Sequence, residues 1–140
     1  MPAKEVFVSV PLSEMLEIRS NLRTKATKST YAVNSLRLLL ALQRSSIYVD
    51  AEPFMINDEL YEPPMYKPSR ETSFNCTVPT PLHKEAELHL DMVSPTLAQH
   101  IARAIELRHD IQGFNGSGNF TASRDAARLE VVRMIPQRSY

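Results

Sequence analysis

The sequence is poor in several residue types that shape small proteins. It has one cysteine, Cys76, no tryptophan and three glycines in 140 residues. A single cysteine excludes an intramolecular disulfide and is typical of a reducing compartment, so we expect a cytoplasmic protein of a cell or host cell. No apolar run approaches the roughly 20 residues that a membrane span needs. The first ten residues also lack the basic-then-apolar order of a signal peptide, so we expect no membrane association.

Neither sign of charge is in excess, because 16 basic residues balance 16 acidic ones. No overall field therefore recruits nucleic acid or a membrane surface. The charge is nevertheless uneven. Residues 1–50 carry seven Lys or Arg against four Asp or Glu, residues 51–93 carry three against eight, and residues 94–140 carry six against four. Two mildly basic ends flank an acidic middle.

Local catalytic and metal-binding motifs are also absent from the sequence. The four histidines (His83, His89, His100 and His109) show neither H-E-x-x-H spacing nor a paired C-x-x-C partner, so we expect no metal and no cofactor. His89 and Asp91 would lie about 7 Å apart on the outer face of a strand, where the carboxylate could orient a general base. A small enzyme with this His/Asp site is one alternative, although such a pair is more often a solvated sheet surface.

The densest apolar run lies in Ser29–Ser45, which we predict to be a helix capped by Ser29 or Thr30. Five leucines occur within seven residues, at positions 36, 38, 39, 40 and 42. At about 100° per residue they surround most of the helix axis, and such a helix must be covered on more than one side. Either the rest of the chain covers it, or a second copy or another protein does. We favour the second explanation and place Leu38 and Leu42 in that interface.

The other predicted elements follow from periodicity and proline placement. The expected strands are Glu5–Val10, Ile47–Ile56, Ser73–Val78, Glu85–Val93 and Leu129–Ile135, and the other expected helices are Ser13–Thr24 and one from Ser94 to Gly113. A helix over residues 122–134 is a close alternative to the last strand. Six of the ten prolines lie between positions 53 and 81, which predicts a long surface excursion over residues 57–82. No internal repeat is evident.

These elements predict one globular α+β domain over residues 1–140. We expect a small, mostly antiparallel sheet with two or three helices on one face. A split β-α-β arrangement resembling the ferredoxin-like plan would accommodate the order. The uncovered face of such a sheet is where a partner or a second copy would bind.

The leading hypothesis is a non-enzymatic protein that binds another protein or itself, such as a small regulator, inhibitor or structural component encoded by a phage or virus. Aromatic and arginine side chains dominate such interfaces. We therefore name as anchors Tyr61, Tyr66, Arg108 and Phe114, beside Leu38 and Leu42. Tyr66 ends a P-P-x-Y segment similar to the ligands of WW domains, and Phe114 lies in the glycine loop that begins at Gly113.

The alternative hypothesis is nucleic-acid binding by the basic segment between residues 19 and 37. Its candidate phosphate contacts are Arg19, Arg23, Lys25, Lys28 and Arg37. Sequence-specific binders usually show more positive charge and more aromatic residues than this segment has. A solvated helix end explains the same pattern.

Overall fold

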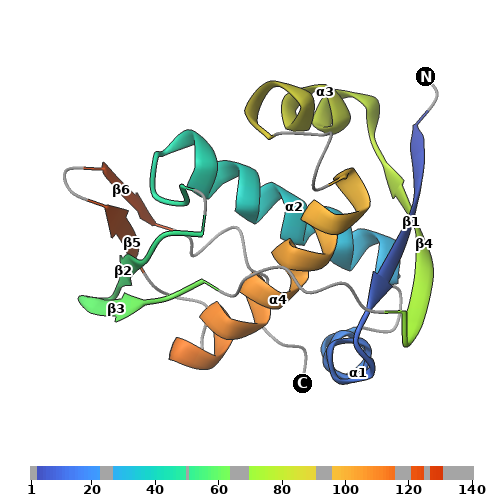
Figure 1. The fold of residues 1–140 in the computed structure, drawn as a ribbon, viewed down its shortest axis with the longest axis horizontal. Helices are drawn as coiled ribbons and strands as arrows, with labels where there is room; N and C mark the ends of the chain where they lie inside the picture. Colours follow the sequence, from blue (N-terminus) through green and yellow to red (C-terminus); the bar gives the residue numbers. More distant parts are fainter. Residues whose placement is uncertain are drawn as a thin grey trace.

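A two-stranded sheet and a four-stranded sheet lie at opposite ends of the molecule, with two long helices between them (Figure 1). The computed structural model describes residues 3–22, 27–49, 51–63, 70–90, 96–115, 121–124 and 127–130. The elements are β1 (Lys4–Val10), α1 (Leu12–Asn21), α2 (Lys28–Arg44), β2 (Phe54–Ile56), β3 (Glu59–Tyr61), β4 (Thr72–Val78), α3 (Thr80–His89), α4 (Leu97–Asn115), β5 (Thr121–Arg124) and β6 (Ala127–Glu130). The α+β class is confirmed. None of the helices in this described part is long and apolar enough to cross a membrane.

The chain contains two units with the same order of elements, a strand, a short helix and a long helix. The first is β1-α1-α2 and the second is β4-α3-α4. Both strands have 7 residues and both short helices have 10. One proline, Pro11 or Pro79, links strand to helix in each unit, because proline has no N–H to continue a strand ladder and a helix start needs none. This structural repeat corrects the expectation that the chain has none.

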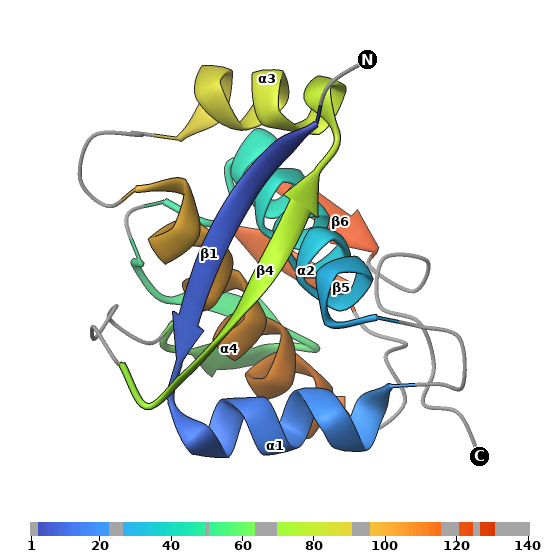
Figure 2. The same cartoon turned by 90° about the vertical axis from the view of Figure 1, so that its right-hand side faces the viewer.

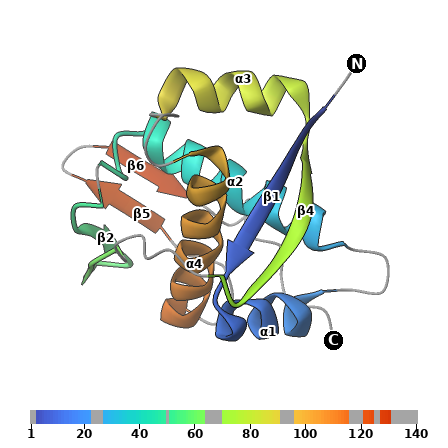
Figure 3. The ribbon, with the colours of Figure 1, turned by 45° about the vertical axis from the view of Figure 1, so that its right-hand side comes forward.

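The two units face each other about an approximate two-fold axis. β1 pairs with β4 antiparallel, and the middle residue of each strand, Phe7 and Asn75, lies opposite the other. The long helices cross over, since α2 packs against β4 and α4 packs against β1, and they also pack against each other. The short helices α1 and α3 lie at opposite ends of the strand pair, as Figures 2 and 3 show. We call the β1–β4 pair the ribbon.

The core has two parts that share the long helices. Under the ribbon, the inward positions of β1 and β4 pack against all four helices, and these positions are Val6, Val8, Val10, Phe74, Cys76 and Val78. Under the four-stranded sheet, whose strand order is β3-β2-β5-β6, a second cluster joins the C-terminal half of α2 to α4, β2 and β5. Alternation of inward and outward side chains explains the pattern in both ribbon strands.

The leucines of α2 are enclosed by their own chain, so the premise that a partner must cover them is wrong. Leu36 and Leu40 belong to the core under the ribbon, whereas Leu38, Leu39 and Leu42 belong to the core under the four-stranded sheet. All five are at most 1% exposed. Because α2 lies between two sheets and beside α4, a helix that is apolar all round finds cover within one chain.

Several boundaries match the sequence expectations. β1 and β4 confirm the predicted strands Glu5–Val10 and Ser73–Val78, and α2 confirms the leucine-rich helix. The helix expected from Ser94 to Gly113 is α4, which continues to Asn115, while Ser94 itself lies outside the described residues. In these segments the spacing of apolar residues in the sequence was enough to predict the type of secondary structure.

The strand expected over Glu85–Val93 is wrong, because the segment up to His89 belongs to helix α3. Leu82 and Ala86, one turn apart, supply its buried face, and Leu88 is 82% exposed rather than inward. The alternation of apolar residues that suggested a strand is accidental here. Residues 91–93 lie outside the described part.

The expectation of one sheet is also wrong, since the strands form two separate sheets and not a split β-α-β arrangement. Of the described residues in the strand predicted over Ile47–Ile56, those of β2 are extended in a sheet, and Ala51, with a φ angle of 60°, interrupts the extended backbone before them. β5 and β6 form where a helix over 122–134 was the alternative. The predicted excursion at 57–82 contains β3 and β4, and its residues 64–69 lie outside the described part.

Candidate nucleic-acid interface

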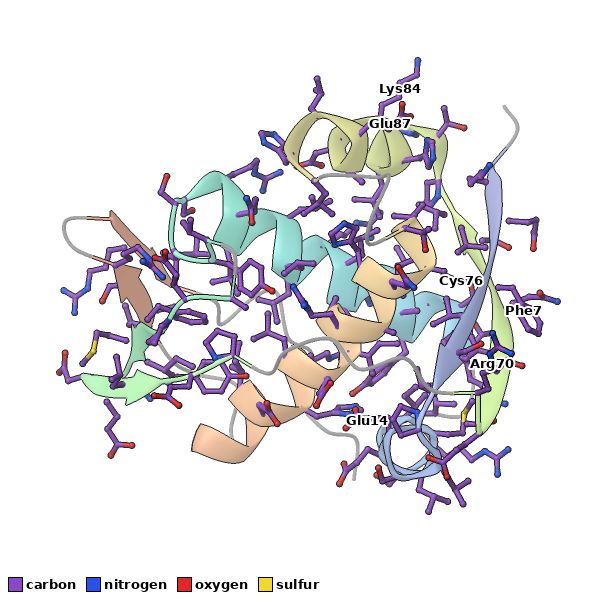
Figure 4. The ribbon with its side chains drawn as sticks, in the orientation of Figure 1. Phe7, Glu14, Arg70, Cys76, Lys84 and Glu87 are labelled. Carbon is purple, nitrogen blue, oxygen red and sulfur yellow. The ribbon has the colours of Figure 1, made fainter. Side chains whose placement is uncertain are left out.

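No helix or strand of the described residues covers the outer face of the ribbon. Its side chains are Glu5, Phe7, Ser9, Ser73, Asn75 and Thr77, all of them exposed except the half-buried Ser9. All helices in the described residues lie behind the ribbon in Figure 2 or beyond its two ends. Phe7 extends away from the body of the molecule (Figure 4) and is 62% exposed. The face therefore presents polar side chains and one aromatic ring to solvent.

The chemistry of this face matches the side chains that contact base edges in DNA. Asparagine pairs with adenine through two hydrogen bonds, glutamate accepts from the amino group of cytosine, and serine and threonine donate or accept. Phenylalanine contacts the methyl group of thymine. The major groove, about 12 Å wide, admits a two-stranded β-ribbon, whose strands lie about 4.8 Å apart.

One hydrogen bond orders the acidic side chain of this face. Glu5 lies opposite Thr77 in the register, and the Thr77 hydroxyl donates to Glu5 Oε1 at 2.8 Å. The carboxylate is thereby held across the ribbon and keeps its second oxygen as an acceptor. The hydrogen bond restricts the rotamers of Glu5, so less side-chain entropy would be lost if its second oxygen accepted a hydrogen bond from a ligand.

The long helices begin beside the ribbon, one on each side. At the start of α2, the Ser29 hydroxyl accepts from the backbone N–H of Thr77 at 2.8 Å, which joins this helix to the free edge of β4. Thr27 caps α2 by accepting from Thr30 N–H at 3.1 Å. At α4, Thr96 and Gln99 cap each other through backbone N–H groups, with distances of 2.8 and 3.5 Å.

Such helix starts carry partial positive charge, which favours phosphate oxygens. Three described cations lie at the ends of the ribbon or at the start of α2. Lys4 begins β1 beside Val78, and Arg70 precedes β4 at the other end of the ribbon. Lys28 is the first residue of α2. These three side chains are exposed or half-buried. Lys4 and Arg70 lie at the two ends of the ribbon, and Lys28 lies at the helix start that joins the edge of β4.

The basic residues named from the sequence are only partly brought together. Lys28 lies at the start of α2, whereas Arg37 lies about 13 Å further along the same helix. Arg37 Nη1 donates a hydrogen bond to Asn34 Oδ1 at 3.4 Å. Arg19 is exposed on α1. Arg23 and Lys25 lie outside the described residues.

Four of the six predicted protein-binding anchors are core residues. Leu38 and Leu42 are fully buried. Tyr61 is buried and its hydroxyl donates to Asp110 Oδ2 at 2.9 Å, and burial, followed by the nearby Asp110, raises the pKa of Tyr61 strongly. The side chains of Tyr66 and Phe114 lie outside the described part.

Arg108 is 4% exposed, and its side chain lies between the two long helices. Its guanidinium lies 3.8 Å from the centre of the Tyr31 ring. Its Nη1 donates to the Tyr31 carbonyl at 3.1 Å and to the Ser35 hydroxyl at 3.3 Å. Burial lowers the pKa of Arg108, while Tyr31 opposes that shift. Arg108 therefore joins α4 to α2 inside the chain.

The predicted catalytic pair, His89 and Asp91, falls partly outside the described residues. His89 is the exposed last residue of helix α3 and therefore does not lie on the strand predicted for it. His109 Nδ1 instead contacts the Glu14 carboxylate and so links α4 to α1. Its other ring nitrogen, Nε2, is buried, which closes it to a substrate. Within the described ranges, no three His, Cys, Asp or Glu side chains gather to hold a metal.

A polar cavity of about 170 Å³ lies at the other end of the molecule, on the four-stranded sheet. Its lining residues are Asn57, Asp58, Thr121, Ser123 and Arg128. Asn57 and Asp58 have φ angles of 49° and 67° and form the two-residue turn between β2 and β3, which explains the residue types at these positions. The cavity follows from this turn and its bonds to β5.

No family model, curated protein or solved structure matches this chain. What the protein binds is therefore inferred from the ribbon and its flanking helices. Sequence reasoning missed this face because it treated β1 and β4 as unrelated strands. The signal that could have revealed it is the recurrence of an alternating strand, a Val-Pro pair and a short helix in both halves.

Proposed function

We propose that the protein binds double-stranded DNA and places the β1–β4 ribbon in the major groove. The observation that carries this proposal is the uncovered outer face, where all six side chains are of types that contact base edges. Proteins of the β-ribbon class read DNA in this way. A small cytoplasmic regulator of a cell, phage or virus is the setting that suits such an activity.

The approximate two-fold axis supports the same function. The two strands of B-DNA are related by local two-fold axes, so a ribbon with the same symmetry presents one strand to each half of a site. The helix starts of α2 and α4 then face phosphates on the two sides of the groove and set the register of the protein on the duplex. The start of α2 is tied directly to the ribbon through Ser29 and Thr77.

Zero net charge limits how strongly phosphates contribute. With Lys4, Lys28 and Arg70 as the described cations near the ribbon, we expect a slope of about −3 in log K against log salt concentration. Base contacts must then supply much of the affinity, which makes binding depend on sequence more than on charge.

The test is selection of duplexes from a random library, followed by titration of the enriched duplex in a fluorescence anisotropy assay. The double variant Phe7→Ala, Asn75→Ala should bind the enriched duplex at least about tenfold more weakly, because two base contacts are removed. Leu60→Ala is the matched control, since Leu60 is 62% exposed like Phe7 but lies on β3 at the opposite end. Equal losses in the two proteins, or no duplex binding at low salt, would contradict the proposal.

Protein binding is the second candidate, favoured by exposed apolar side chains around α1. Leu12 and Leu16 are one helical turn apart and are 51% and 54% exposed. They offer an apolar stripe to another protein or to a second copy of this chain, independently of the buried α2. Leu12→Ser, Leu16→Ser should abolish such an association and leave DNA binding unchanged, as measured by light scattering and anisotropy. Association through this stripe resists salt, whereas DNA binding weakens with it.

A further inference from the structure

We infer that the protein recognises a non-palindromic duplex site as a single chain, with β1 and β4 reading different bases. The inference rests on the proposed DNA binding and concerns the kind of sequence that is bound. It follows from a comparison of the two units across their approximate two-fold axis.

The symmetry of a DNA site usually mirrors the symmetry of the protein. A symmetric dimer inserts two identical strands and therefore prefers a palindrome. Here one chain supplies both strands of the ribbon, and each strand has its own sequence. Nothing then forces the two halves of the site to be alike.

The outer faces of the two strands differ in chemistry at two of three equivalent positions. Along each strand the outward residues are Glu5, Phe7 and Ser9 on β1, and Ser73, Asn75 and Thr77 on β4. The third position alone is similar, a serine on one strand and a threonine on the other. At the middle position a ring that cannot hydrogen-bond lies opposite an amide that can.

The middle pair lies closest to the axis and decides the asymmetry. Asn75 suits adenine, whose N6 and N7 it can bond together, whereas Phe7 suits the thymine methyl group. At the first position Glu5 suits the amino group of cytosine, and Ser73 is more permissive. A palindrome presents the same base to both strands and can satisfy only one of them.

The positively charged residues beside the ribbon are also distributed unequally between the two units. In the first unit Lys4 begins β1 and Lys28 begins α2. In the second unit the corresponding first residues are Thr72 of β4 and Leu97 of α4, and the described cation beside the ribbon is Arg70, two residues before Thr72. Two of these three cations therefore lie at the Lys4–Val78 end of the ribbon and one at the other end, which favours one orientation on the duplex.

The experiment is selection of duplexes from a random library with the full chain, together with native mass spectrometry of the complex. The expected result is a non-palindromic motif bound by one chain per duplex. A palindromic motif or two chains per site would overturn the inference while leaving DNA binding in place. Failure to bind any duplex would overturn both this inference and the proposed function.

A symmetrised ribbon provides the sharper test. The triple variant Glu5→Ser, Phe7→Asn, Ser9→Thr gives β1 the same outer face as β4, and all three positions lie outside the core. We expect its selected motif to become palindromic in the central positions. Retention of the wild-type motif by a variant with an unchanged melting temperature would overturn the inference.

Single substitutions assign each strand to its half of the site. Asn75→Ala should reduce base discrimination about fivefold to 150-fold in one half only, and Phe7→Ala should reduce it in the other half. Leu60→Ala should change neither half. If each ribbon substitution relaxes both halves equally, the two strands do not read separate bases and the inference fails.

Discussion

The two ends of the molecule are held together in different ways. At the ribbon end, seven consecutive residue pairs join β1 to β4, and the alternating inward side chains pack on both long helices. At the four-stranded end the strands have three or four residues, and side chains complete the connections. Regular pairing with a packed inner face leaves the outer face of the ribbon free, whereas the polar groups at the other end are used in building the fold.

Arg124 shows how the four-stranded end is completed. From β5 its guanidinium donates to the carbonyls of Ile47 and Pro53 at 3.0 and 2.9 Å, and to Glu52 Oε2 at 2.6 Å. Asn57 adds a second connection, because its side-chain oxygen accepts from Thr121 N–H at 3.0 Å. Residues that hydrogen-bond several backbone groups at this end stabilise the fold, whereas the outer face of the ribbon is exposed to solvent.

The largest effect on folding is expected from a charge introduced into the buried helix α2, which lies between the two sheets. Leu38→Asp should leave the protein unfolded or insoluble, because an unpaired carboxylate would replace a fully buried leucine. Leu60→Asp, at an exposed position of β3, should fold normally. Circular dichroism of both proteins checks the expectation, and a folded Leu38→Asp monomer would show that α2 is not enclosed as described.

A smaller loss should follow from removal of the Arg124 connections. Arg124→Ala should lower the free energy of unfolding by about 2 kcal/mol, because two backbone carbonyls lose a charged donor. Arg128→Ala, on the neighbouring strand with an exposed side chain, should change it by less than about 0.5 kcal/mol. Urea denaturation distinguishes the two, and equal midpoints would mean that Arg124 does not stabilise this end.

The thiol of Cys76 reports on the ribbon end. Burial raises the pKa of Cys76 above its usual 9.0. Below that value both the folded and the unfolded thiol are protonated. Above it the unfolded thiol ionises first, so the free energy of unfolding should fall as pH rises, by at most about 1.4 kcal/mol per unit. Cys76→Ala should lose this component of the alkaline dependence, which urea denaturation between pH 8 and 10 measures.

The same thiol should react slowly with iodoacetamide in the folded protein and rapidly in urea, because the thiolate is the nucleophile and Cys76 is fully buried. Fast alkylation under native conditions would show that the ribbon opens readily. That result would remove the contrast between a regular ribbon end and a four-stranded end completed by side chains.

The smallest effect concerns a single phosphate contact at the ribbon. Lys28→Ala should reduce the magnitude of the salt slope of DNA binding by about 1 and leave thermal stability nearly unchanged. Arg37→Ala, further along the same helix, should leave the slope as it is. An identical slope in wild type and Lys28→Ala would exclude the start of α2 from the interface.

The sequence predicted the elements whose periodicity is strong and local, which include β1, α2, β4 and α4. It failed at α3, where apolar residues alternate by chance and Leu88 points to solvent. The binding residues were harder to predict. Tyr61 and Arg108 are types common in interfaces, yet Asp110 and Tyr31 hold them inside the molecule. Composition cannot show whether an aromatic or arginine side chain has a partner within its own chain.

The sequence by itself determined the α+β class, the ribbon strands and the extent of the long helices, because alternation and helical spacing act between residues close in the chain. Only the tertiary structure decided that β1 pairs with β4, that α2 is covered from both sides, and that six side chains face outward together. A strand specifies which residues share a face but not which distant strand it joins, and a helix that is apolar all round marks no preferred side. Those choices were made by the packing of the two repeated units against each other.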